Sequence, residues 1–180
     1  MDSDTIKAAV ASYWRYTKQC HLVALEASSW LKPFNYGGQA DILAVTKRRH
    51  LVETEVKVSL ADMRRDKSKR KHTYYKQGSS YYPTQRFFFA VPKEIANAAC
   101  LLCGQLFPYA GVLGSDGTDG WGVEIYRPAR LLNGTRLTFP QILRMTREQS
   151  ATVCRLSMKV AQQKEVISRL RVLQKIKELP

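Results

Sequence analysis

Two short stretches, ADILAVT at residues 40–46 and LVETEVKV at residues 51–58, decide the fold of this chain. Each has the length and the apolar, β-branched content of a strand, and residues 47–50 between them form a turn. The two stretches are therefore predicted to pair as a hairpin. A single carboxylate, Asp41, interrupts the first strand, and a carboxylate in an apolar strand is costly unless it is paired or binds a metal.

Side chains of a strand alternate between its two faces, which divides residues 51–59 into two sets. One face carries Val52, Thr54, Val56 and Val58, and the opposite face carries Leu51, Glu53, Glu55, Lys57 and Ser59. An ordinary half-exposed strand has this pattern too. In the hairpin, however, Asp41 lies beside Glu55, with Lys57 one step along. Two carboxylates and one ammonium group then converge at a strand edge.

Metal-assisted hydrolysis of a phosphodiester is the chemistry that this set suits. Mg²⁺ takes oxygen ligands, typically carboxylates, water and substrate phosphate. Asp41 and Glu55 would hold the ion, with the carbonyl of Val56 as a third ligand. A bound metal acidifies water and neutralises charge that develops on the phosphate. Lys57 would orient that water or stabilise the pentavalent phosphorus species.

The elements around the hairpin predict an α/β domain with a mixed central sheet flanked by helices. Helices are predicted over residues 4–19, 60–76 and 93–107, and further strands over residues 21–30, 86–91, 111–114 and 121–127. Residues 1–132 form the predicted domain. From about residue 140 to residue 179 the chain has one long polar helical pattern, so residues 135–180 are predicted to be a helical appendage.

Positive charge is the main compositional signal in the 180 residues. The formal net charge is +14, and two blocks carry the excess. Residues 47–76 hold 11 basic and 4 acidic side chains, and residues 135–180 hold 10 and 3. Clustered positive charge suits a polyanion such as nucleic acid, although a solvated surface is the alternative. No apolar run is long enough for a membrane span, and the first residues lack a signal peptide, which predicts a cytoplasmic protein.

The hairpin and its flanking helices resemble the PD-(D/E)XK nuclease superfamily, in which the fold is restriction-endonuclease-like. Asp41 is followed by Glu55-Val56-Lys57, with a helix before and a helix after. The proline of the motif's name is Ala40 here. The stretch from Gly37 to Asp41, the stretch EVKVSLAD at residues 55–62 and the later RFFFAVP are similar to the MmcB-like DNA repair proteins of that superfamily. The resemblance covers about residues 20–132.

This resemblance implies a Mg²⁺- or Mn²⁺-dependent endonuclease of DNA repair, recombination or processing, with a bacterial or mobile-element origin. It also implies a further acidic site residue, which many members place on the first helix. The first helix here has no glutamate, so Glu26 is the best candidate, followed by Glu53. RNA stays open as a substrate. The alternative function is a nucleic-acid-binding protein that keeps the fold without cutting.

The basic segment after the hairpin is predicted to grip the phosphate backbone beside the site. Its proposed contacts are Arg64, Arg65, Lys67, Lys69, Arg70, Lys71 and His72. Some members of the superfamily also carry a Gln-x-x-x-Tyr motif after this strand. Gln77 to Tyr81 fits its letters, but Gly-Ser-Ser favours a loop over the helix that the motif needs. Gln77 remains a candidate phosphate or water contact.

The appendage carries a narrow apolar seam. Its members are Val153, Leu156, Val160, Ile167 and Leu170, with Gln163 at the one skipped position. A lone helix with so thin a stripe would be marginal in water. The seam must therefore pack on its own domain, pair with a second chain as a homodimer, or become ordered on nucleic acid. The net positive charge of the appendage opposes self-pairing at low salt.

Overall fold

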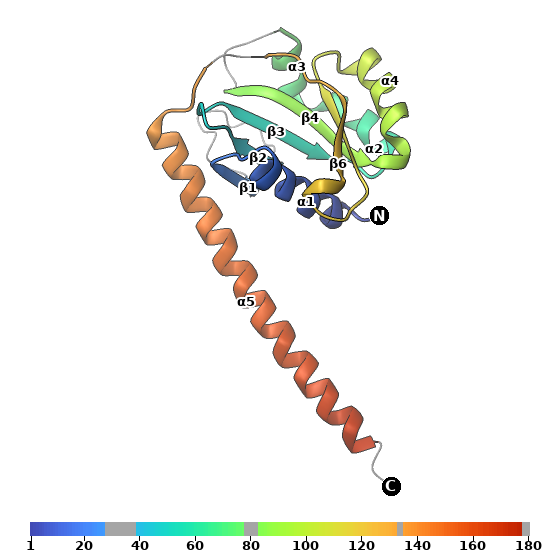
Figure 1. Cartoon of the computed structure of the whole chain (residues 1–180), viewed down its shortest axis with the longest axis vertical. Coiled ribbons are helices and arrows are strands. Elements are labelled where there is room, and N and C mark those ends of the chain that lie inside the picture. Colours follow the sequence, from blue (N-terminus) through green and yellow to red (C-terminus); the bar gives the residue numbers. More distant parts are fainter. Residues whose placement is uncertain (28–38, 78–82, 133–134, 178–180) are drawn as a thin grey trace.

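In the computed structural model, six strands form one mixed sheet between layers of helices (Figure 1). The structure describes residues 1–27, 39–77, 83–132 and 135–177, and their side chains as far as residue 171. The strands are β1 (Leu22–Ala27), β2 (Ala40–Val45), β3 (Leu51–Val56), β4 (Thr84–Pro92), β5 (Gly111–Ser115) and β6 (Val123–Arg127). They lie in the sheet in the order of the sequence.

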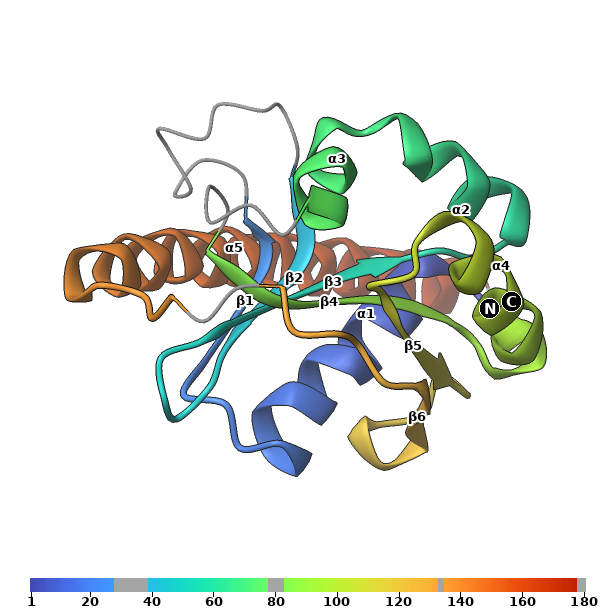
Figure 2. The same cartoon turned by 90° about the horizontal axis from the view of Figure 1, so that it is seen from above.

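The α-helices are α1 (Ser3–Ser12), α2 (Leu60–Arg65), α3 (Arg70–Gln77), α4 (Ala96–Leu106) and α5 (Phe139–Lys177). A π-helical turn at Tyr13–Thr17 follows α1, and 3₁₀ turns lie at Asp66–Ser68, Lys93–Ile95 and Gly120–Gly122. Figure 2 shows α1 on one face of the sheet and α2, α3 and α4 on the other. The predicted α/β class, with a mixed sheet, flanking helices and a C-terminal helical extension, is confirmed.

The predicted hairpin is confirmed. Strands β2 and β3 pair antiparallel with Ile42 opposite Thr54, whereas β3 and β4 pair parallel. The parallel pair needs a long crossover, and α2 and α3 provide it. Every residue of β3 is buried, because helices cover both of its faces. The half-exposed strand that the sequence also allowed is therefore ruled out.

The alternation of side chains along β3 determines which helices each face of the strand contacts. Val52 and Val56 pack with α1 in one core cluster, where the indole Nε1 of Trp14 donates to Thr54 Oγ1 at 3.1 Å. Glu53 and Glu55 lie on the opposite face, toward α3, and are only 2% exposed. The fold thus buries two carboxylates on the crossover side of the sheet.

The single helix predicted over residues 60–76 is wrong in its middle. Ser59 caps α2, whose last residue is Arg65, and a 3₁₀ turn and an extended Lys69 (φ −69°, ψ 129°) separate it from α3. This break turns Asp66 into the interior, where it is 3% exposed and bound by cationic groups. The gain from pairing a buried carboxylate explains why the helix is interrupted there.

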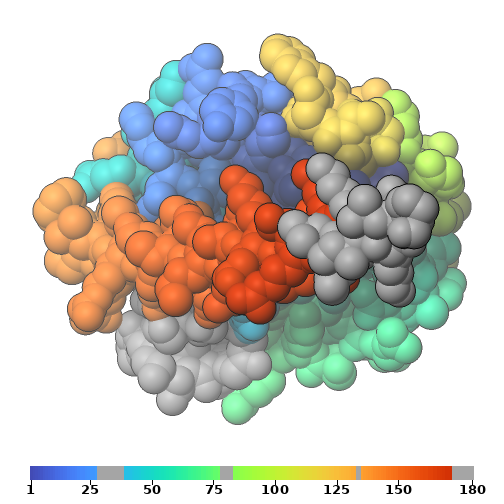
Figure 3. Space-filling model, turned by 90° about the horizontal axis from the view of Figure 1, so that it is seen from below, coloured from blue at the N-terminus to red at the C-terminus, as the bar shows by residue number. Residues whose placement is uncertain are grey.

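Helix α5 begins as part of the domain and then leaves it. Leu137 and Met145 are buried against Leu43 and Leu51, so the first turns of the predicted appendage complete the core. Figure 1 shows the rest of α5 projecting beyond the sheet, and in Figure 3, seen from below, this helix lies in front of the domain. The predicted seam, from Val153 to Leu170, lies on this projecting part, and its apolar side chains are 46–59% exposed. No helix within the described residues is long and apolar enough to cross a membrane.

Candidate functional site

Asp41 and Glu55 meet at neighbouring positions of β2 and β3, as the sequence predicted. Continuing the register from the Ile42–Thr54 pair places Asp41 opposite Glu55. Asp41 Oδ2 accepts a hydrogen bond from the Val56 N–H at 2.7 Å. Burial, and next to it the negative charge of Glu55, raise the pKa of Asp41 above its ordinary value. Two acidic groups therefore share one partly buried location, where a bound cation would relieve their repulsion.

Glu55 is surrounded by three ammonium groups. Its Oε2 lies 3.1 Å from Lys69 Nζ and 3.7 Å from Lys57 Nζ, and its Oε1 forms an ion pair with Lys71. Burial alone would raise the pKa of Glu55, but the charges of Lys71 and Lys69 outweigh burial and lower it. Glu55 is therefore ionised and held in place.

Asp66 is the centre of the cationic side of this cluster. Its Oδ1 lies 2.7 Å from both Lys57 Nζ and Lys69 Nζ, and its Oδ2 lies 2.7 Å from His72 Nε2. Burial would raise the pKa of Asp66, but hydrogen bonds from His72, Lys57 and Lys69 lower it well below the ordinary range. Asp66 thus fixes Lys57 and Lys69 next to Glu55.

Sequence reasoning missed the role of Asp66. The residue lies in a segment whose pattern predicts one basic helix, and nothing in that pattern marks Asp66 as buried. The one available signal was composition, since only Asp62 and Asp66 are acidic among the basic side chains of residues 60–76.

Glu53 is joined to the same cluster through Lys71, and its carboxylate is fully engaged. It accepts from Lys71 Nζ at 2.7 Å, from the hydroxyl of Tyr75, and from Thr84 Oγ1 at 3.2 Å. Burial would lower the pKa of Lys71, but the charges of Glu53 and Glu55 raise it well above its ordinary value. Lys71 is therefore a charged link between the two glutamates, and the contacts of Glu53 indicate a structural role.

Glu26 lies on the α1 side of Asp41. It has a left-handed backbone conformation, with φ 51°, and forms an ion pair with Lys7 of α1. The charges of Lys7 and Glu26 both reach Asp41 and act on its pKa in opposite directions. Helix α1 therefore supplies a cation here, and Glu26, whose side chain is 36% exposed, is the nearby acidic residue.

The predicted nucleic-acid contacts divide into exposed and buried residues. Arg64, Arg65, Lys67, Arg70 and Gln77 are exposed, and Lys69 is intermediate. Lys71 and His72, predicted to contact phosphate, are instead 8% and 1% exposed and are bound inside the cluster. His72 joins Asp66 to the hydroxyl of Tyr109. The Gln-x-x-x-Tyr motif runs into residues 78–82, which lie outside the described part of the chain.

The donor set at Asp41 fits a hard divalent cation. The N–H of Val56 points to Asp41, and the N–H and C=O of one strand residue face the same side, so the Val56 carbonyl faces Asp41 as well. Two carboxylates and a carbonyl are oxygen ligands of the kind that Mg²⁺ takes. No group of three or more His, Cys, Asp or Glu side chains within the described residues is arranged for a metal. Water and substrate would therefore complete the coordination, and a cation would compete with Lys69 for Glu55.

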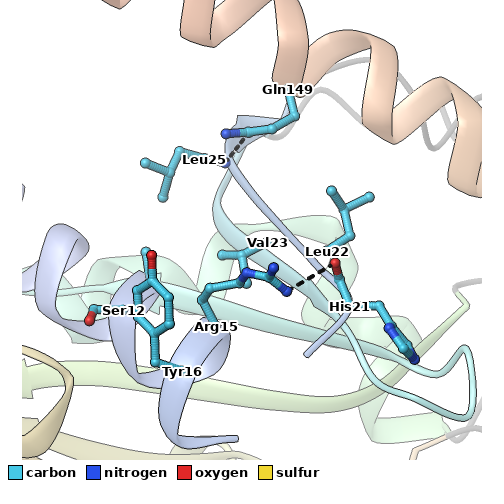
Figure 4. A pocket seen from close by; sticks show the side chains of 9 residues that line it. Ser12, Arg15, Tyr16, His21, Leu22, Val23, Leu25 and Gln149 are labelled. Carbon is cyan, nitrogen blue, oxygen red and sulfur yellow. Dashed lines mark hydrogen bonds between the residues drawn. The ribbon is translucent and has the colours of Figure 1, made fainter. Parts of the chain in front are cut away.

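A separate hollow of about 440 Å³ lies between α1, β1 and α5 (Figure 4). Leu22, Val23 and Leu25 of β1 are among its lining residues, and the guanidinium of Arg15 donates to the carbonyls of Cys20 and His21. The Leu25 N–H donates to Gln149 Oε1 at 3.1 Å, which ties α5 to the edge strand. No carboxylate lines this hollow, and its arginine is already bonded to backbone carbonyls.

A comparison with solved structures supports the fold. The chain is similar to the SPO1766 protein of unknown function from Silicibacter pomeroyi, with a TM-score of 0.56 and 18% sequence identity over 100% of this chain and 96% of that one. No protein-family model matches the chain, and no curated protein matches it. At this identity the likeness shows a common fold.

Proposed function

We propose that the protein is a metal-dependent nuclease that hydrolyses phosphodiester bonds in DNA, with a PD-(D/E)XK site. The observation that carries the proposal is the placement of Asp41 opposite Glu55, with Lys57 two residues further on, directly after β3. The order of helices and strands around this pair is the one that the resemblance to the superfamily implies.

The roles of the residues follow from their surroundings. Asp41, Glu55 and the carbonyl of Val56 would hold Mg²⁺ or Mn²⁺, which when bound supplies an acidified water and a positive charge. Lys57 Nζ lies 2.7 Å from Asp66 Oδ1, which fixes its position, and it would face the phosphate and the attacking water. A fixed cation that needs no rearrangement lowers the cost of charge that develops in the transition state.

Cleavage of DNA by conservative variants tests this proposal. We expect Asp41→Asn, Glu55→Gln and Lys57→Ala each to abolish Mg²⁺-dependent cleavage of single-stranded, duplex and branched DNA. Glu94→Gln makes the same chemical change at an exposed position and is expected to retain full activity. EDTA should stop the wild type, and Mg²⁺ or Mn²⁺ should restore it. Full cleavage by purified Glu55→Gln would refute the assignment.

A second candidate is a nucleic-acid-binding protein that does not cut. The observation that favours it is the engagement of both Glu55 oxygens by lysines, Lys69 on Oε2 and Lys71 on Oε1. Binding without cleavage in Mg²⁺ and in Mn²⁺, by a wild type that retains its fold, would support this candidate. DNA binding by the carboxylate variants is expected under both proposals, since removing negative charge reduces the repulsion of phosphate.

A further inference from the structure

A second cluster of basic side chains surrounds a hollow at the turn between β2 and β3. The hollow has a volume of about 430 Å³, and its basic lining residues are Lys18, Lys47, Arg48, His50 and Arg86. Its other lining residues, Thr46 and Gln85, are neutral and polar, and no carboxylate lines it. Such a concave arrangement concentrates positive potential and favours an anionic ligand.

Three cations of this hollow contact neutral groups, which leave their positive charges uncancelled. Lys47 Nζ donates to Gln19 Oε1, and Arg86 Nη1 donates to the carbonyl of Ala129. Lys18 Nζ lies 5.3 Å from the centre of the Tyr13 ring. Within the described part of the chain, no ion pair joins any of these three cations, or Arg48, to a carboxylate. The cluster therefore keeps its positive charge.

His50 adds an independent observation. Its Nδ1 is buried and has no hydrogen-bond partner among the described residues. Leaving a buried polar atom unpaired costs free energy that a ligand could recover. The backbone around it is fixed, because the His50 N–H donates to Thr46 Oγ1 at 3.1 Å and the Thr46 N–H donates to the His50 carbonyl at 2.9 Å. His50 therefore offers an unfilled hydrogen-bonding position on a rigid turn.

The hollow is separate from the carboxylate cluster. His50 lies directly before β3, an even number of residues from Val52 and Thr54, whose side chains face α1. Glu53 and Glu55 face α3 instead. At about 3.3 Å per strand residue, the five residues from His50 to Glu55 correspond to about 17 Å. A ligand in the hollow would therefore lie on the other face and at the other end of β3.

We propose that this hollow is an anion site that binds a phosphate group, independently of the proposed nuclease activity. The ammonium and guanidinium groups supply charge-assisted hydrogen bonds to phosphate oxygens, and the Nδ1 of His50, in the tautomer that carries a hydrogen there, donates one more. The phosphate belongs either to a nucleic-acid backbone or to a small phosphate-bearing molecule. Both sources present the same oxygens to the site.

The imidazole nitrogen signals of His50 distinguish these sources. The wild type is titrated in EDTA with inorganic phosphate and, separately, with a 15-nucleotide single-stranded DNA, and ¹⁵N-detected histidine spectra are recorded. The His50→Asn variant assigns the signal, and His21, exposed outside the hollow, is the internal reference. A His50 shift with phosphate alone supports a small ligand. A shift with DNA alone supports a backbone phosphate.

Paired variants test whether the cations carry the binding. We expect Lys47→Ala/Arg48→Ala to weaken the response at His50 about tenfold or more, from the loss of two charge-assisted contacts. Lys159→Ala/Lys164→Ala removes the same charge from exposed positions of α5 and should leave the His50 response to inorganic phosphate unchanged. The proposal is overturned if neither probe shifts His50, or if both double variants respond alike.

Discussion

Removal of the buried link between Glu53 and Glu55 is the sharpest test of the site's energetics. Lys71 is 8% exposed, and its Nζ lies 2.7 Å from Glu53 Oε1 while also pairing with Glu55. At an effective dielectric constant of about 20, one such contact is worth about 6 kcal/mol before desolvation. The cost of desolvating these charges offsets much of that attraction. Loss of the lysine, however, leaves the two carboxylates buried without their shared cation. Such a loss typically costs about 3–5 kcal/mol.

We therefore expect Lys71→Met to lower the free energy of unfolding by about 3–5 kcal/mol, measured by urea denaturation at pH 7 without metal. Adding Glu53→Gln should recover part of this loss, because it removes one of the stranded charges. The coupling between the two substitutions should be about 1–3 kcal/mol. Lys76→Met, on the exposed side of α3, is the matched control and should change stability by less than about 0.5 kcal/mol. A loss below about 1 kcal/mol in Lys71→Met, or strict additivity with Glu53→Gln, would refute the reasoning.

Three further predictions concern the backbone contacts, the buried histidine and α5. Charge reversal at exposed Arg64 and Lys67 should weaken the binding of duplex DNA of every sequence alike. It should also reduce the slope of log affinity against log salt by about 0.9 per lost contact. An unchanged slope would show that this segment is only a solvated face. Burial lowers the pKa of His72 below 6.5, so its contribution to stability is complete above that pH and declines as pH falls. Urea denaturation at pH 7.5 and 5.5 should show a loss of at most about 1.4 kcal/mol per pH unit from this group, and a smaller total loss in His72→Gln. We expect light scattering of the wild type at tens of micromolar protein in moderate salt to find a dimer formed through the exposed seam of α5. The Leu156→Glu/Ile167→Glu variant should be a monomer. A monomeric wild type would instead favour α5 as a DNA-contacting helix.

The hairpin and the pair at its end could be predicted because they depend on local patterns. Alternation fixes which side chains of β3 share a face, and antiparallel register then places Asp41 opposite Glu55. The lone carboxylate in β2 was informative because an apolar strand rarely tolerates one without a partner. The same reasoning separated Thr54, which meets Trp14, from Glu53 and Glu55.

The cationic half of the cluster could not be predicted from periodicity. A continuous helix over residues 60–76 would have kept most of its lysines in solvent, where lysine is usually found. The 3₁₀ turn and the extended Lys69 change the direction of the chain, so that Asp66, Lys71 and His72 all face inward. Their partners on β3 are 14–18 residues away from Lys69 and Lys71 in sequence, and no pattern within one element reports such contacts.

The charges of the cluster indicate how cation and phosphate binding would be linked in the proposed nuclease. Asp41, Glu53, Glu55 and Asp66 carry four negative charges when ionised, against three positive charges on Lys57, Lys69 and Lys71. His72 adds none at neutral pH, because its pKa is lowered. The cluster by itself is therefore one negative charge in excess and repels a phosphodiester, whereas one divalent cation reverses that sign. The attraction that first brings nucleic acid to the protein must then come from exposed groups outside the cluster, and only a cation held by Asp41 and Glu55 would draw the scissile phosphate against Lys57.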